Sequence, residues 1–251
     1  MSYQDAFEKV EQTEDYLVDL LQKIVAIGAA GAIRIDVTAV GRSCHSGMNY
    51  LGVNAIEELF PILGELLVLK KEVEGRLSRL PTFPVPGCPY DKMTPMFNLN
   101  IIRGGTKENI VPGACELTIN RRYIVDERYE DVVAEIEEAL RRGRASSRLE
   151  DLRVSFVHDY PPVECDPKQP ATRKAMEAKR AVHGYEDFVF GGLSGSTDLG
   201  FVMQALEPRQ VQVAGFGLVR ATNILAHAAD EYVYVEDLVS MTKELVHDLA
   251  F

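Results

Sequence analysis

The strongest constraint on the fold is a stretch in which the hydrophobic period changes from that of a strand to that of a helix. Between residues 32 and 40 apolar and polar side chains alternate, which is the pattern of a half-buried strand. After Gly41 and a short polar loop, apolar residues recur at helical spacing, at Val53, Ile56, Phe60, Leu63 and Leu67. A strand therefore leads through a loop into a helix at about residues 52–74, and Pro61 is expected to kink or locally break that helix.

Three further strands and a second helix follow in an order that is typical of one motif. Strands are predicted at residues 97–102, 115–123 and 152–157, and an amphipathic helix from Asp126 to about Arg142. The order strand, helix, strand, strand, helix, strand is that of a split βαβ unit, in which two helices cover one face of a four-stranded antiparallel sheet. The strands at 97–102 and 115–123 should be antiparallel neighbours. One sheet face and an edge stay uncovered, and a symmetric dimer is one way to cover such an edge.

The rest of the chain has the alternating helices and strands of an α/β layer. Residues 5–27 are predicted to form an amphipathic helix that ends at the small-residue joint 28–31. Beyond residue 160 the patterns predict a helix at 170–183, strands at 188–190 and 211–214, a small-residue loop at 191–198 and a closing helix at 236–249. The inner stripe of that closing helix is expected to be Leu238, Met241, Leu245 and Leu249. We therefore expect two domains, one from residues 1–30 and 160–251 and one from residues 31–159.

Composition excludes several classes of partner. The 251-residue chain has a formal net charge of -11 at pH 7, which argues against nucleic-acid and anionic-membrane surfaces. The first residues lack the layout of a signal peptide, and the most apolar segment, residues 59–69, is too short to span a bilayer. The four cysteines form no CxxC pair, so reduced thiols in a cytoplasmic protein fit best.

Three polar residues of the split βαβ unit are candidates for a functional site. His45 lies in the loop after the first strand, where functional side chains concentrate, although a solvated loop histidine is the simpler explanation. Asn109 follows a Gly-Gly turn that could equally be an ordinary hairpin. Arg122 alternates with apolar residues on its strand and could hold a carboxylate in bidentate fashion, or could merely be solvated.

Two more candidates lie in the C-terminal third. Gly195, Ser196 and Thr197 offer hydroxyls and backbone N–H groups at a predicted helix start, where a carboxylate can bind, although helix capping explains them equally well. His227 could be a metal ligand, a general base or a packed loop histidine. One histidine cannot hold a catalytic zinc, because such a site needs three protein ligands.

The order of these motifs resembles that of the M20 family of metallohydrolases. HSG and GVNAI are followed by GGTKENIVPG, the NRR near a strand end, GSTD, and AHAADEYV before a terminal helix. The family includes carboxypeptidase G2, acetylornithine deacetylase, succinyl-diaminopimelate desuccinylase and aminoacylase-1. The resemblance covers nearly all of residues 32–251, and EDYLVDLLQKIVAI is similar to the family's opening helix.

The resemblance implies a fold, a metal centre and roles for the candidate residues. It implies a ferredoxin-like lid domain through which two chains form a homodimer. It also implies an α/β zinc-peptidase-like catalytic domain, which is truncated in this chain. In the family, the active site of that domain holds two zinc ions. His45 would reach the partner's active site and stabilise the tetrahedral intermediate. Asn109 and Arg122 would hold the carboxylate of a small substrate such as an N-acyl amino acid or peptide. Gly195, Ser196 and Thr197 would complete that pocket, and His227 would be a zinc ligand.

One departure from the family separates three hypotheses. The block that carries the family's HxD motif, bridging aspartate and Glu-Glu pair is absent between Ile27 and the lid strand, and no HxD occurs in the sequence. The chain is a working amide hydrolase only if the sequence omits a block of the natural protein. The second hypothesis is a shortened M20 protein whose remaining role is dimerisation and folding of the lid domain. The third is a small binding module that keeps the carboxylate pocket of Asn109 and Arg122 without catalysis. We favour a shortened peptidase or deacylase, inactive alone, with zinc absent or incompletely held.

Overall fold

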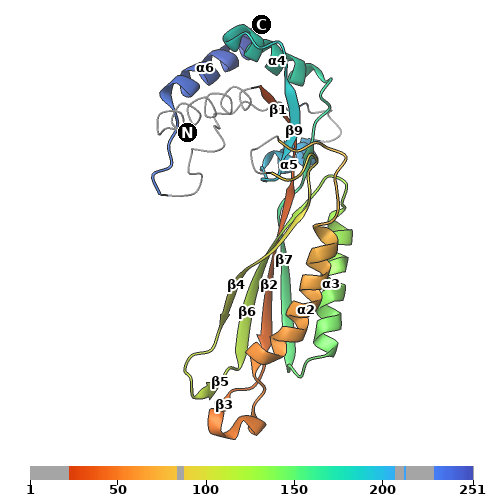
Figure 1. Cartoon of the computed structure of the whole chain (residues 1–251), viewed down its shortest axis with the longest axis vertical. Coiled ribbons are helices and arrows are strands. Elements are labelled where there is room, and N and C mark those ends of the chain that lie inside the picture. Colours follow the sequence, from red (N-terminus) through yellow and green to blue (C-terminus); the bar gives the residue numbers. More distant parts are fainter. Residues whose placement is uncertain (1–22, 84–87, 207–211, 213–228, 251) are drawn as a thin grey trace, which may run out of the picture.

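The molecule is elongated and carries its two larger sheets one after the other along its long axis, with a third, two-stranded sheet at one end (Figure 1). The computed structural model describes residues 23–83, 88–206, 212 and 229–250. The larger sheet contains β2 (Gly31–Val40), β4 (Met96–Gly104), β6 (Ala114–Tyr123) and β7 (Asp151–Tyr160). Their order is β4-β6-β2-β7, with every pair antiparallel. Helices α2 (Ala55–Val73) and α3 (Tyr129–Ala145) lie on one face of this sheet, so the split βαβ prediction is confirmed.

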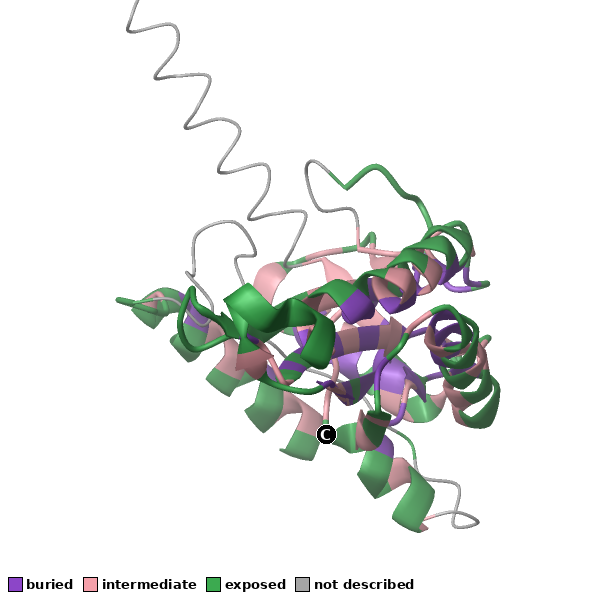
Figure 2. Cartoon of the chain, turned by 90° about the horizontal axis from the view of Figure 1, so that it is seen from below, coloured by how far each residue is buried: buried purple, intermediate pink, exposed green. Residues whose placement is uncertain are grey.

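The core of this unit lies between the sheet and the two helices, as the alternation predicts. On β2 the side chains of Ile33, Ile35, Val37 and Ala39 are at most 1% exposed, whereas Arg34 on the opposite face is exposed. Leu59, Ile62 and Leu66 of α2 are fully buried against them, and buried residues gather on the sides of the helices that face the sheet (Figure 2). Gly143 of α3 allows the two helices to approach closely, because a Cβ there would lie 2.4 Å from the Cα of Ile62.

Helix α2 runs through Pro61 without interruption, so the predicted break is wrong. Proline in a helix interior removes one hydrogen bond and costs about 3 kcal/mol. Burying side chains such as Leu59 and Ile62 on either side of Pro61 contributes roughly 1.5–3 kcal/mol each, which outweighs that cost. The helix begins where the Asn54 side chain accepts hydrogen bonds from the N–H groups of Ile56 and Glu57.

The smaller sheet lies at the other end of the molecule. It contains β8 (Val163–Glu164), β1 (Ile24–Ala29) and β9 (Val189–Leu193) in the order β8-β1-β9, with β1 parallel to β9. Helices α4 (Pro170–His183), α5 (Leu199–Leu206) and α6 (Val235–Ala250) complete this part. The strand predicted at 211–214 falls outside the described residues except for residue 212, which is in no strand. No described helix is long and apolar enough to cross a membrane.

The predicted helix at residues 5–27 is wrong where the structure describes it. Residues 24–27 belong to strand β1, and residues 5–22 lie outside the described residues. The small residues at 28–31 are not a helix stop, because β1 passes into β2 through Ala30 alone. Their size is required by packing: a Cβ on Gly31 would lie 2.3 Å from the Tyr123 ring, and one on Gly28 would lie 2.6 Å from Leu80.

Helix α6 turns its apolar side outwards, contrary to the predicted inner stripe. Leu238 is 45% exposed and Leu249 is 84% exposed, whereas Glu244 is buried. A carboxylate oxygen of Glu244 lies 2.6 Å from Nε2 of His183 on α4, and its other oxygen lies 3.6 Å from Nζ of Lys179. These buried polar contacts bind α6 to α4, because leaving them unpaired inside the protein would cost more than exposing the leucines.

Candidate substrate-binding and catalytic site

The structure brings His45 and Asn109 together at the far end of the large sheet, which we call the tip. Two short strands meet there, β3 (Cys44–His45) and β5 (Ile110–Val111), and His45 pairs with Ile110. The N–H of Ser46 donates a hydrogen bond of 3.0 Å to the carbonyl of Asn109. The histidine loop and the asparagine turn, far apart in sequence, therefore form one surface.

The hydrogen bonding of His45 fixes which ring nitrogen can donate. Its Nδ1 accepts the N–H of Gly47 at 3.1 Å, an arrangement that caps the short helix η1 (Ser46–Leu51). A nitrogen that accepts a hydrogen bond carries no proton, so the neutral ring has its proton on Nε2. Because the side chain is exposed, this Nε2–H is available to an oxygen that develops negative charge.

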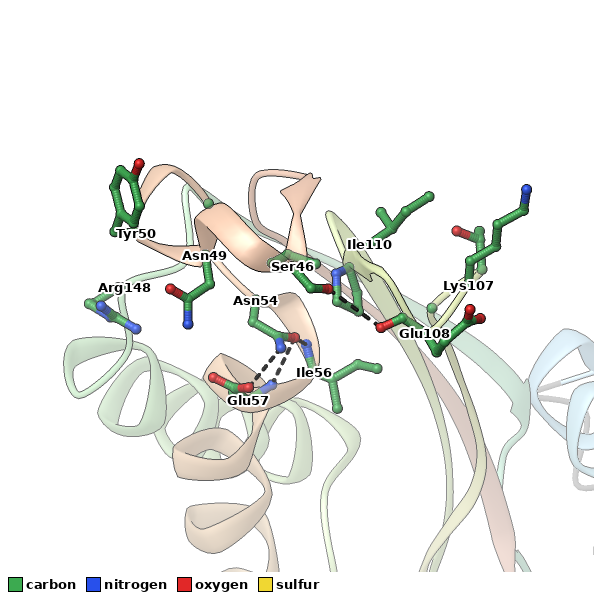
Figure 3. A pocket seen from close by; sticks show the side chains of 15 residues that line it. Ser46, Asn49, Tyr50, Asn54, Ile56, Glu57, Lys107, Glu108, Ile110 and Arg148 are labelled. Atoms are coloured by element: carbon green, nitrogen blue, oxygen red, sulfur yellow. Dashed lines mark hydrogen bonds between the residues drawn. The ribbon is translucent and has the colours of Figure 1, made fainter.

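A polar hollow of about 880 Å³ opens beside this surface (Figure 3). Its walls come from the loop after β3, the start of α2 and the turn before β5. Both charge signs are present, with Lys107 and Arg148 against Glu57 and Glu108. The hollow lies at the tip and does not contain Arg122, so the candidate residues form two groups.

The second group lies at the junction of the two sheets. An Nη1–H of Arg122 on β6 donates to the hydroxyl of Ser196, which follows β9. Its Nε–H donates to the Oδ1 of Asn120 at 3.1 Å, two residues earlier on the same face of the strand. These two hydrogen bonds direct the half-buried guanidinium of Arg122 toward the loop after β9. The remaining N–H groups of the guanidinium can bind a planar anion such as a carboxylate. Asn120 was missed by sequence reasoning, although its alternation with Arg122 was visible.

The loop that carries Ser196 is held by its neighbours. The carbonyl of Gly195 accepts the N–H of Ala30 at 3.1 Å, which ties the loop to the connection between β1 and β2. The hydroxyl of Thr197 accepts the N–H of Leu199 at 3.4 Å, an ordinary capping contact at the start of α5. Of these three residues, Ser196 contacts Arg122, whereas Gly195 and Thr197 shape the loop.

An aromatic cluster under the junction is a feature that sequence reasoning did not find. The Tyr123 hydroxyl lies 2.7 Å from Nε2 of His158, and the Tyr129 ring stacks on His158 with centroids 4.2 Å apart. The ring of Phe201, on helix α5 in the part with the smaller sheet, lies beside His158, with ring centroids 6.1 Å apart. Burial lowers the pKa of His158 and raises the pKa of Tyr123, because each charged form would be poorly solvated. The cluster thus joins β6, β7, α3 and α5 with uncharged groups.

The tip and the junction are too far apart to form one site within a single chain. Arg122 and Ala114 stand eight positions apart on β6, which corresponds to about 26 Å of extended strand. Asn109 lies beyond that strand end, in the turn before β5. A ligand held by Arg122 therefore cannot touch His45 or Asn109 of the same chain.

The described residues do not by themselves fit a catalytic metal centre. In the ranges that the structure covers, no three His, Cys, Asp or Glu side chains are grouped as metal ligands. His227, the candidate ligand from the sequence, lies outside those ranges.

Comparison with known proteins identifies the large sheet and its helices. The family model of the M20 peptidase dimerisation domain matches residues 27–146. A probable carboxypeptidase from Ajellomyces dermatitidis is 30% identical over 91% of this chain and 45% of its own length. An acetylornithine deacetylase from Pectobacterium carotovorum is 30% identical over 86% of this chain and 50% of its own. The chain spans about half the length of the curated relatives it matches.

Solved structures agree with this assignment. A dipeptidase from Saccharomyces cerevisiae superposes with a TM-score of 0.73 at 17% identity, over 90% of this chain and 55% of that one. An M20 family metallo-carboxypeptidase from Sulfolobus solfataricus gives a TM-score of 0.67 at 14% identity, over 94% and 66%. The fold is thus that of a peptidase with a dimerisation domain. Residues 27–146 are thus an M20 peptidase dimerisation domain, and the relatives support assigning the chain to the M20 family of metallohydrolases.

Proposed function

We propose that this chain supplies the dimerisation domain and the carboxylate-binding pocket of an M20 amide hydrolase. Its substrates would be N-acyl amino acids or peptides with a free carboxylate, cleaved at the amide bond. One observation carries the proposal: the hydrogen bond between Arg122 and Ser196 joins two residues that the family resemblance assigns to one pocket, although Arg122 lies on β6 of the larger sheet and Ser196 follows β9 of the smaller one. We place the domain boundaries at residues 31–159 for the lid and 1–30 with 160–251 for the catalytic part.

The geometry supports distinct roles for the candidate residues. The Arg122 guanidinium, positioned by Asn120 and Ser196, would bind the substrate carboxylate as a fork. Asn109 would donate its side-chain amide to the same group. The Nε2–H of His45 would stabilise the oxyanion of the tetrahedral intermediate, because its Nδ1 is already an acceptor.

The separation of tip and junction supports a homodimer. Since about 26 Å of strand lies between the two groups, His45 and Asn109 would act in the site of the partner chain. Figure 1 places α2 alongside the sheet, and its outer face offers a surface for this contact. Phe60 and Leu67, two turns apart on α2, are 65% and 52% exposed, and Ile102 on the edge strand β4 is 57% exposed. Such an edge is normally covered.

We propose further that the chain by itself is not an active hydrolase. Metal dependence belongs to the family, and His227 would be one ligand, but the sequence contains no HxD motif to complete a centre. A metal-bound water would supply the nucleophile in a complete enzyme. The four free cysteines of the structure support a reducing, cytoplasmic location.

Elemental analysis of the purified chain tests this part. We expect well under one zinc ion per chain after dialysis, and no hydrolysis of N-acyl amino acids, because one histidine gives weak binding. About two ions per chain together with turnover would contradict inactivity. Ligand binding by the metal-free chain, without turnover, is the result that this proposal expects, because the carboxylate pocket does not need the metal.

Calorimetry with hippurate, an N-acyl amino acid, tests the pocket. We expect Arg122→Ala to weaken hippurate binding about 30-fold, roughly 2 kcal/mol, because a charge-assisted fork is lost. Arg34→Ala is the matched control, since Arg34 lies on the same sheet face, pairs with Asp36 at 3.2 Å and should leave binding unchanged. Hippuramide, which lacks the carboxylate, should bind both variants alike. Equal hippurate affinity for Arg122→Ala and the parent would refute the pocket.

A further inference from the structure

Arg121 precedes Arg122 on β6 and points to the opposite face of the sheet, into the core. Its side chain is 0% exposed, which makes it one of the largest fully buried side chains among the described residues. A charged residue at a position that alternates with Ile119 and Tyr123 is unexpected, because a fully buried charge must be paired. The contacts of this guanidinium therefore indicate why it is there.

Two contacts hold the Arg121 guanidinium. One Nη2–H pairs with Glu127 at 2.5 Å, and an Nη1–H donates to the backbone carbonyl of Arg122. Glu127, whose side chain is 8% exposed, also accepts the N–H of Ile124 at 3.0 Å and pairs with Arg76 at 2.8 Å. One carboxylate thus anchors Arg121, Arg76 and the turn that follows β6.

This arrangement is not the most stable one available to the core. Burial lowers the pKa of Arg121, and among the described residues its Nε–H has no hydrogen-bond partner. Replacing a buried ion pair by apolar residues of similar volume is often neutral or stabilising. The contribution that an apolar residue could not make is the hydrogen bond to the carbonyl of Arg122.

We infer that Arg121 is a positioning residue for Arg122, an inference that rests on the proposed carboxylate pocket. Its hydrogen bond to the carbonyl of Arg122, made from the core side of the sheet, fixes the backbone of Arg122. The side chain of Arg122 is thereby directed toward Ser196. The end of β6 is where this matters, because the strand stops at Tyr123 and regular sheet pairing stops with it. Glu127 in turn fixes Arg121, so the pocket is supported from the core side.

The test compares Arg121→Met and Arg121→Lys with Arg76→Met. Arg121→Met leaves Glu127 paired with Arg76 and with the N–H of Ile124. Arg121→Lys keeps a positive charge beside Glu127 but lacks the second guanidinium nitrogen that donates to the carbonyl of Arg122. Arg76→Met disturbs the same carboxylate without touching Arg122. Denaturant unfolding of each variant shows which of them remain folded.

Two readouts separate positioning from stability: hippurate affinity by calorimetry, and the Nε–H signal of Arg122 in ¹H–¹⁵N spectra. We expect both Arg121 variants to bind hippurate about 10-fold more weakly and to shift or broaden that signal. Arg76→Met should change neither. If Arg122→Ala weakens binding but the folded Arg121 variants bind like the parent, the inference is wrong. If Arg122→Ala itself has no effect, the proposed pocket fails instead.

Discussion

The double variant Phe60→Glu, Ile102→Lys is expected to be monomeric at concentrations where the parent chain is a dimer. These side chains are 65% and 57% exposed on α2 and on the edge strand β4, and a dimer through this surface would bury both. Placing a charge on each removes apolar contact and leaves a desolvated ion in the interface. We expect the dimer dissociation constant to rise at least about 100-fold, roughly 2.7 kcal/mol.

Sedimentation equilibrium measures this change directly. Val246→Glu is the control, because Val246 is 60% exposed on α6, in the part of the molecule with the smaller sheet, and its replacement should leave the dimer intact. A parent chain that is itself monomeric at high concentration would contradict the homodimer. If the double variant remains dimeric, the dimer interface lies on another face of the molecule.

Mixing Asn109→Ala with Arg122→Ala chains is expected to restore ligand sites that neither variant has alone. If tip residues of one chain complete the junction of its partner, a mixed dimer contains one site with both lesions and one intact site. Free exchange makes about half of the dimers mixed, so about a quarter of all sites regain parental hippurate affinity. Calorimetry before and after exchange measures that fraction.

The control for this experiment uses the same two lesions on chains that also carry Phe60→Glu and Ile102→Lys. Those chains cannot form mixed dimers, so no sites should return. A mixture that behaves as the plain average of its two components would show that each site is built from a single chain. That result would also conflict with the span of β6 between Arg122 and Ala114.

The large sheet was predictable because its strands have one buried face. In β2 and β6 the period of two assigns each residue to a face, and the apolar residues at 33–39 and 115–123 follow it, whereas Arg121 lies on the buried face. Strand β1 was not predictable, since the apolar run of Ile24, Val25 and Ile27 fits a helix as well as a strand, and parallel pairing with β9 decides between them. The orientation of α6 depends on Glu244 meeting His183, which no local pattern records.

The candidate site was predictable as residue types but not as two separate groups. The family resemblance assigned Arg122 and Ser196 to one pocket, and the structure shows them in contact. The association of His45 with Asn109 depends on a pair of two-residue strands, β3 and β5, which are too short for a periodic signal. Arg121 was hidden because a charged residue in a strand is ordinarily read as solvated.

If the large sheet tilted about Ala30, the single residue between β1 and β2, the pivot would lie beside the loop of Ser196. Because Arg122 pairs with Ala32, close to that pivot, it would hardly move if the sheet tilted. A tilt of about 10° would carry the opposite end, with His45, through about 5 Å over the 26 Å of strand. Binding of the carboxylate by Arg122 could then stay constant while the distance that the His45 imidazole reaches into a neighbouring chain varied.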